Sequence, residues 1–173
     1  MKKASNLLLI LVISLTLSHP SGWTAKDQGL EKLQTWLKGL GENYSIQELK
    51  NLKSLYLQSK QIQVLPKEIG KLQNLQSLEL SWNQLKALPK EIGRLKKLQG
   101  LYLGSNQLKT LPKKIGKLKN LQSLILQINH LNALPKEIGN LKNLRWLGLR
   151  NNKLSEREKE KIKKLLPKCR IDF

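Results

Sequence analysis

The chain has 173 residues, with 32 Lys and Arg against 12 Asp and Glu, which gives a formal net charge of +20 and a sequence pI of about 10.2. This charge predicts attraction to anionic partners: nucleic acid, acidic polysaccharide, anionic lipid or acidic proteins. One cysteine excludes a disulfide framework and a cysteine-built zinc site, and two histidines leave little room for metal or acid–base chemistry.

The first 25 residues have the pattern of an export signal. Lys2 and Lys3 form a basic start, and an uncharged apolar run follows over residues 7–17. About 11 residues are too few to span a hydrocarbon core but fit the apolar region of a secretory signal. We therefore predict a signal peptide over residues 1–25, cleaved between residues 18 and 25. The product would be exported, either secreted or at the cell surface, with the periplasm also open. The alternative is a buried N-terminal helix.

A 23-residue period organises the rest of the chain. Leucines alternate with other residues near the start of each unit, as in a strand with one buried face. One unit of this size cannot bury its leucines alone, so stacked units with a continuous core are expected. A Leu-Pro pair and then an Ile-Gly pair recur in four units, at Leu65-Pro66 and Ile69-Gly70, Leu88-Pro89 and Ile92-Gly93, Leu111-Pro112 and Ile115-Gly116, and Leu134-Pro135 and Ile138-Gly139.

These residues resemble the leucine-rich repeat family, whose pattern is LxxLxLxxNxL. The match covers residues 52–154, as four full units and a partial fifth. The LPxxIGxLxNL variant is similar to repeats of exported bacterial proteins, including those of spirochaetes. The resemblance implies an α/β fold, a right-handed solenoid with a curved parallel sheet on the concave face and loops or short helical turns on the convex face.

The resemblance also implies a structural role for one asparagine in the turn after each strand. In this family such side chains stack inside the solenoid and bond backbone groups that the turn leaves unpaired. Lys60 stands at this position in the first unit, which suggests a more open turn there. The four asparagines are Asn83, Asn106, Asn129 and Asn152.

Both ends of the array are predicted to be capped, because a solenoid exposes its core at its ends. Residues 26–51 should form a helical cap and a half repeat, with Gly41 stopping the helix. Residues 155–173 should form a cap helix and a short strand, because Ser155 and Glu158 have capping-box spacing. The leucine stripe of the first cap is Leu30, Leu33, Leu37 and Leu40, and the last strand alternates Cys169, Ile171 and Phe173.

No catalytic motif appears, so we predict that the protein is not an enzyme and uses no cofactor or metal. His130 has the pattern of a polar surface residue at the edge of a strand. Cys169 is interpreted as a buried cap residue; the alternative is a free surface thiol that could link a dimer. A monomer or weak dimer is expected.

The variable positions of the strands form the candidate recognition surface. Side chains between the buried leucines point to the concave face, and the column three positions later borders it. Large aromatic and aliphatic residues occupy these columns, as is typical of binding hot spots. The alternative is that caps or neighbouring side chains cover them. The candidate residues are Tyr56, Glu79, Trp82, Tyr102, Ile125, Ile128, Trp146 and Arg150.

Basic residues after the Leu-Pro pairs form a second candidate surface on the convex flank. They are either residues of the repeat template kept for solubility or a polyanion-binding surface. A glycosaminoglycan, lipopolysaccharide or an anionic membrane would be the ligand. The candidate residues are Lys67, Lys71, Lys90, Arg94, Lys97, Lys113 and Lys117.

These surfaces predict one leading function and leave two alternatives open. The leading function is an exported module that binds a protein ligand through the concave face, with adhesion to a host surface protein or the cell envelope implied by the resemblance. The alternatives are a polyanion binder and a structural envelope protein. Nucleic acid is disfavoured, because the aromatics are not interleaved with the lysines and export removes the protein from it.

Overall fold

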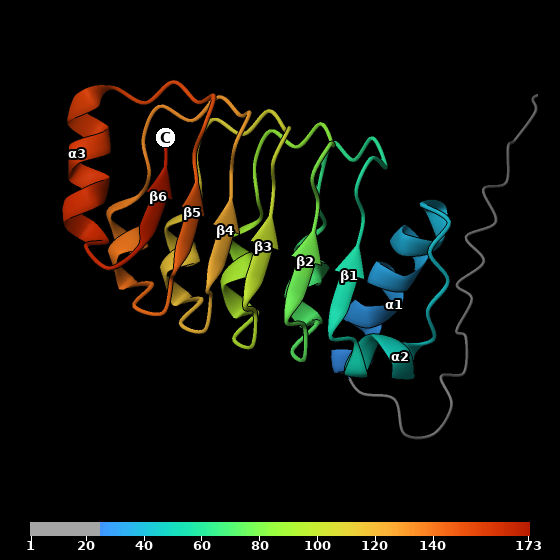
Figure 1. Cartoon of the computed structure of the whole chain (residues 1–173). Helices are drawn as coiled ribbons and strands as arrows, with labels where there is room; N and C mark the ends of the chain where they lie inside the picture. The colour runs from blue at the N-terminus through green and yellow to red at the C-terminus, as the bar shows by residue number, and fades with distance from the viewer. Residues whose placement is uncertain (1–24) are drawn as a thin grey trace, which may run out of the picture.

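The computed structural model describes residues 25–173 as an arc of stacked turns with a parallel sheet along one side (Figure 1). The six strands follow one another in sequence order across the sheet. Neighbouring repeat strands pair with a shift of one unit, so that Leu55 lies opposite Leu78. The predicted signal peptide lies outside the described residues except for Ala25. The strands are β1 (Ser54–Tyr56), β2 (Ser77–Glu79), β3 (Gly100–Tyr102), β4 (Ser123–Ile125), β5 (Trp146–Gly148) and β6 (Arg170–Asp172).

A short 3-10 helix follows each Leu-Pro pair on the side opposite the sheet. The glycine in each unit allows these helices to approach closely: a Cβ added to Gly93 would lie 2.4 Å from the carbonyl oxygen of Lys114 in the next helix. The Ile-Gly pair of the repeat therefore packs one unit on the next. The four helices are η1 (Lys67–Lys71), η2 (Lys90–Arg94), η3 (Lys113–Lys117) and η4 (Lys136–Asn140).

Helices close both ends of the continuous leucine and isoleucine core, as predicted. At the N-terminal end lie α1 (Ala25–Gly39) and α2 (Ile46–Asn51), and at the other end lies α3 (Glu156–Leu165). Gly41 has φ +82° just after α1, and the Glu42 N–H donates to the Leu37 carbonyl at 3.0 Å. These features form a glycine-terminated helix end. The leucine-rich repeat fold class is confirmed. Among residues 25–173, no helix is long and apolar enough to cross a membrane.

The capping box predicted at the C-terminal cap is only half formed. The Ser155 hydroxyl accepts from the Glu158 N–H at 3.3 Å. The Glu158 carboxylate does not return to Ser155, because it accepts from the Leu134 N–H at 3.0 Å and so joins α3 to the last full repeat. A complete box instead begins α2, where Ser45 and Glu48 bond each other reciprocally. These hydrogen bonds lower the pKa of Glu48.

The turn asparagines bond the backbone inside the solenoid, as the resemblance implied. The Asn106 amide nitrogen donates to the carbonyls of Leu80 at 3.0 Å and Leu103 at 3.1 Å. Its amide oxygen accepts from the Leu85 N–H at 3.0 Å. One side chain therefore connects two units and gives the buried Leu85 N–H its partner, while the Leu80 carbonyl also accepts from Asn83 at 2.9 Å.

Candidate functional site

The sheet brings four of the predicted concave residues into one row. Tyr56 lies opposite Glu79, Glu79 opposite Tyr102, and Tyr102 opposite Ile125. Gly148 continues the row on β5, and Asp172 of β6 lies opposite it. Parallel strands lie about 4.8 Å apart, so these positions form one contiguous surface.

The predicted concave residues differ in exposure. Trp82 is 65% exposed, Tyr56 59% and Ile128 45%. Tyr102 and Ile125 are only partly exposed, because glycines let them lie against the sheet. A Cβ added to Gly100 would lie 2.8 Å from the Tyr102 ring, and one added to Gly148 would lie 3.3 Å from the Ile125 side chain. The alternative that neighbours cover these residues is therefore true in part.

Trp82 and Ile128 occupy a left-handed backbone position in the turn after their strands. Their φ angles are +59° and +56°, and Ser59, Ser105 and Asn151 have the same conformation at the same repeat position. A bulky or β-branched residue is strained in this region, where asparagine and glycine are favoured. Such strain is typical of functional positions. The sequence shows which residues stand here but not that the backbone is left-handed.

The C-terminal end of the concave face is partly covered by β6. The Arg150 Nε lies 2.7 Å from the Asp172 carboxylate, so this predicted concave residue is already paired within the chain. The Arg170 guanidinium lies 4.6 Å from the centre of the Trp146 ring, in cation–π geometry. The last strand, which pairs its residues directly with those of β5, explains both contacts.

Glu79 is an acidic side chain among the concave aromatic residues. One carboxylate oxygen accepts from the Ser81 N–H at 2.7 Å, which fixes its direction along the strand. Among the described residues, none of the ion pairs involves Glu79. This carboxylate is therefore available to a cationic group of a ligand.

The predicted basic residues lie on the 3-10 helices, away from the sheet. Lys67, Lys90 and Lys113 begin η1, η2 and η3, and these helices end with Lys71, Arg94 and Lys117. Lys97 follows η2, and its ammonium donates to the Asn74 side-chain oxygen at 2.7 Å. The basic flank and the aromatic face are thus separate surfaces.

The ion pairs of residues 25–173 all involve the two ends of the array. Lys50–Asp27 joins α2 to α1 within the N-terminal cap, and Lys60–Glu42 joins the first repeat to that cap. The other four lie within α3 or join Arg150 to β6. None contains a predicted basic-flank residue, so the positive charge of this flank is not paired within the described part of the chain.

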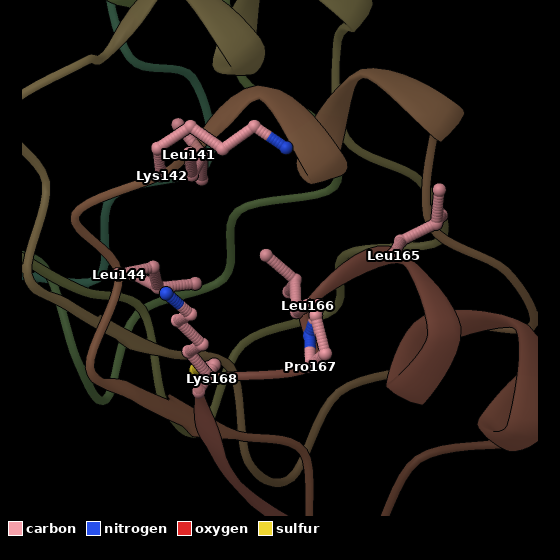
Figure 2. A pocket seen from close by; sticks show the side chains of 8 residues that line it. Leu141, Lys142, Leu144, Leu165, Leu166, Pro167 and Lys168 are labelled. Carbon is pink, nitrogen blue, oxygen red and sulfur yellow. The ribbon is translucent and has the colours of Figure 1, made fainter.

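A cavity of about 250 Å³ lies between the last repeat and the C-terminal cap (Figure 2). Leucines and Pro167 form its apolar walls, and Lys142 and Lys168 border it. Cys169, which also lines it, is half-buried, and burial raises the pKa of its thiol to about 11. The thiol is therefore protonated at neutral pH and is a poor nucleophile. His130 is an exposed polar residue, as predicted.

No group of three or more His, Cys, Asp or Glu side chains in residues 25–173 could hold a metal ion. The two surfaces defined by exposed aromatics and by unpaired cations are the candidate sites.

Parallel strands stacked at 23-residue steps over one leucine core define a repeat solenoid. The family described as "Leucine-rich repeat region" matches residues 32–170. The chain belongs to the leucine-rich repeat family. No match was found among curated proteins. Members of this family are typically binding modules, and they commonly bind proteins.

Three solved structures are similar to the chain. A leucine-rich repeat protein of Leptospira interrogans is 44% identical, with a TM-score of 0.64, over 78% of this chain and 42% of that one. An internalin of Listeria monocytogenes is 28% identical, with a TM-score of 0.60, over 72% and 35%. A chain in the BIR3–SERK2 complex of Arabidopsis thaliana is 37% identical, with a TM-score of 0.56, over 61% and 58%. The chain thus spans less than two thirds of each of these relatives.

Proposed function

We propose that this protein is an exported recognition module that binds a protein ligand through the concave face of its sheet. The observation that carries the proposal is the exposure of Tyr56, Trp82 and Ile128 on the first, second and fourth repeats. Clustered exposed aromatics are typical of interface hot spots, where large rigid side chains bury much apolar area. The strained backbone of Trp82 and Ile128 adds support, because folding alone does not favour bulky residues there.

The partner would combine an apolar surface with a cationic group. The apolar part would cover the exposed aromatics, and the cation would pair with Glu79. A cationic patch on the partner would avoid the basic flank, which lies on the other side of the solenoid. The partner that we propose is a host surface protein or a component of the cell envelope.

A binding screen tests this placement. We would immobilise residues 26–173 and measure binding of purified host matrix and cell-surface proteins by surface plasmon resonance. For any protein bound, the double variant Tyr56→Ala/Trp82→Ala should lose at least about tenfold in affinity. Val64→Ala is the control, because Val64 is 74% exposed but lies outside the strands. Equal affinities for the double variant and the control would reject the concave face.

We also propose that residues 1–25 direct export. The basic start and the short apolar run support this role. Antibody detection in cytoplasm, envelope and culture medium, with the mass of the mature protein, tests it. A product shortened by 18 to 25 residues outside the cytoplasm is expected. A full-length cytoplasmic product would overturn export.

The second candidate function is binding of a polyanion by the basic flank. The observation that favours it is the absence of ion pairs at the predicted flank residues within residues 25–173. Two rows of cations repeat across the 3-10 helices, which suits a linear ligand with repeated charges. Each sulfate or phosphate contact would release counterions and make binding steeply dependent on salt. Retention on heparin no stronger than on a plain cation exchanger would reject this function.

A further inference from the structure

A distinct groove of about 290 Å³ lies on the basic flank between η2 and η3. Its lining contains one carboxylate, that of Glu91, and Gly93. Its lining also contains five cationic side chains, which come from two successive repeats. These cations are Lys90, Arg94, Lys96, Lys114 and Lys117.

The charge of this groove results from a departure from the repeat template. The second position of the 3-10 helix is Glu68, Glu91 or Glu137 in the other units, but it is Lys114 in η3. The preceding groove, between α1 and the first two 3-10 helices, contains both Glu68 and Glu91. Only the change to Lys114 leaves a groove with five cations and one carboxylate. A lysine-rich template copied for solubility does not account for this change.

The cations of the groove are crowded. The Lys96 ammonium donates to the Lys117 carbonyl at 3.2 Å, which places it beside the end of η3. Partial burial, and then the charges of Lys117 and Lys119, lower the pKa of Lys96. Like charges held together in this way disfavour one another, and a bound anion would reverse the effect.

We propose that the groove between η2 and η3 is a subsite for one phosphate or sulfate group of a polyanionic ligand. The subsite rests on the polyanion-binding function proposed above and gives it a fixed anchor. Arg94 can bond two oxygens of such a group through its planar guanidinium, and the lysines add point charges around it. Lys114 distinguishes this groove from its neighbour.

Charge reversal at Lys114 tests the subsite. Lys114→Glu restores the residue that three other units carry, so the fold already accommodates it. Lys109→Glu is the matched control, because Lys109 is exposed in the same unit but does not line the groove. Both variants have the same net charge, so non-specific attraction changes equally. Circular dichroism would verify that both variants fold.

Calorimetric titration with inorganic pyrophosphate measures the subsite directly. We expect Lys114→Glu to weaken pyrophosphate binding by at least about tenfold and Lys109→Glu by less than about threefold, since only the first removes a direct contact. Equal loss in the two variants would overturn the subsite, as would no binding by the unaltered protein.

Heparin retention, measured in parallel, tests the function on which the subsite rests. Specific heparin retention together with equal pyrophosphate affinities in the two variants would reject the subsite but leave polyanion binding standing. Pyrophosphate binding lost only in Lys114→Glu would support the subsite, even if heparin retention matched that on a cation exchanger. In that case binding of a polyanion would be rejected and the subsite would stand. Failure with both probes would overturn both proposals.

Discussion

The ammonium group of Lys60 donates a hydrogen bond to the carbonyl oxygen of Leu40 at 3.1 Å. It also lies 2.8 Å from the Glu42 carboxylate. Lys60 stands where the later units have an asparagine, and its longer side chain reaches the end of α1 instead of bonding within the turns. The backbone of this turn also differs, because Gln61 has φ +56°, a conformation that no later unit repeats at that position. The first repeat is thereby tied to the N-terminal cap.

Replacing Lys60 by methionine should lower the free energy of unfolding by about 1 kcal/mol, because a charged hydrogen bond and a partly exposed ion pair are lost. Methionine keeps most of the side-chain length, so packing is little changed. Urea denaturation followed by circular dichroism measures the effect. Lys67→Met, at an exposed lysine without an ion pair, should be near neutral. A Lys60 variant as stable as this control would contradict the role of the contact.

Asn106→Ala should destabilise the array strongly. The substitution leaves the N–H of Leu85 without its partner inside the solenoid, and such a buried unpaired group costs about 1–3 kcal/mol. It also removes one of the two hydrogen bonds to the carbonyl of Leu80, which still accepts from Asn83. We expect a loss of about 2 kcal/mol or more, seen as a lower urea midpoint. Asn152→Ala should cost less, because Asn152 is partly exposed at the last turn. Equal losses of stability in the two variants would show that burial of the asparagine does not determine the cost of its removal.

Gly93→Ala should be disruptive, whereas Gly39→Ala should not. The added Cβ at Gly93 would meet the backbone oxygen of Lys114 at 2.4 Å, so the 3-10 helices must separate. The added Cβ at Gly39 would meet nothing within 4 Å, and alanine favours the helix by about 0.5–1 kcal/mol. Thermal unfolding should show a lower midpoint for the first variant and an equal or higher one for the second. A tolerated alanine at position 93 would contradict the close packing of the units.

Ile128→Asn should stabilise the protein while removing an exposed apolar side chain. Asn151 already adopts the same left-handed conformation at this repeat position. A non-glycine residue costs about 1–2 kcal/mol in this region, and asparagine relieves part of that cost, so we expect a gain of about 1 kcal/mol. Differential scanning calorimetry would measure the gain. Val64→Asn, at an exposed residue with negative φ, should change little; a destabilised Ile128 variant would refute strain at this position.

The Cys169 thiol should react slowly in the folded protein. Its pKa of about 11 lies above the ordinary value of 9.0, so the thiolate fraction at pH 8 is lower by about 100-fold than in the unfolded chain. Iodoacetamide labelling with and without urea measures the ratio. Because the folded state holds the proton more tightly, this group makes stability fall as pH rises from about 9 to about 11. Equal labelling rates in the two states would contradict a partly buried thiol.

The repeat pattern predicted most of the fold. The 23-residue spacing of leucines, Leu-Pro pairs and Ile-Gly pairs predicted parallel strands, convex helical turns and one shared core. This was possible because each unit has the same sequence pattern and therefore forms the same local structure. The caps were predicted from Gly41 and the Ser155 spacing. The complete capping box at Ser45 was missed, since residues 46–51 match a half repeat as well as they match a helix.

The sequence alone determined which residues occupy the concave row and which cations repeat along the flank, because register follows directly from a fixed period. Only the tertiary structure decided their environments. The Tyr102 ring packs against Gly100, and Asp172 forms an ion pair with Arg150. Partial burial, and then the charges of Lys117 and Lys119 in the next repeat, lower the pKa of Lys96. These relationships join different strands and helices, so they depend on packing distances that a linear pattern does not contain. The left-handed turns of Trp82 and Ile128 have the same origin: hydrogen bonds to the next unit hold a backbone conformation that the residue types themselves disfavour.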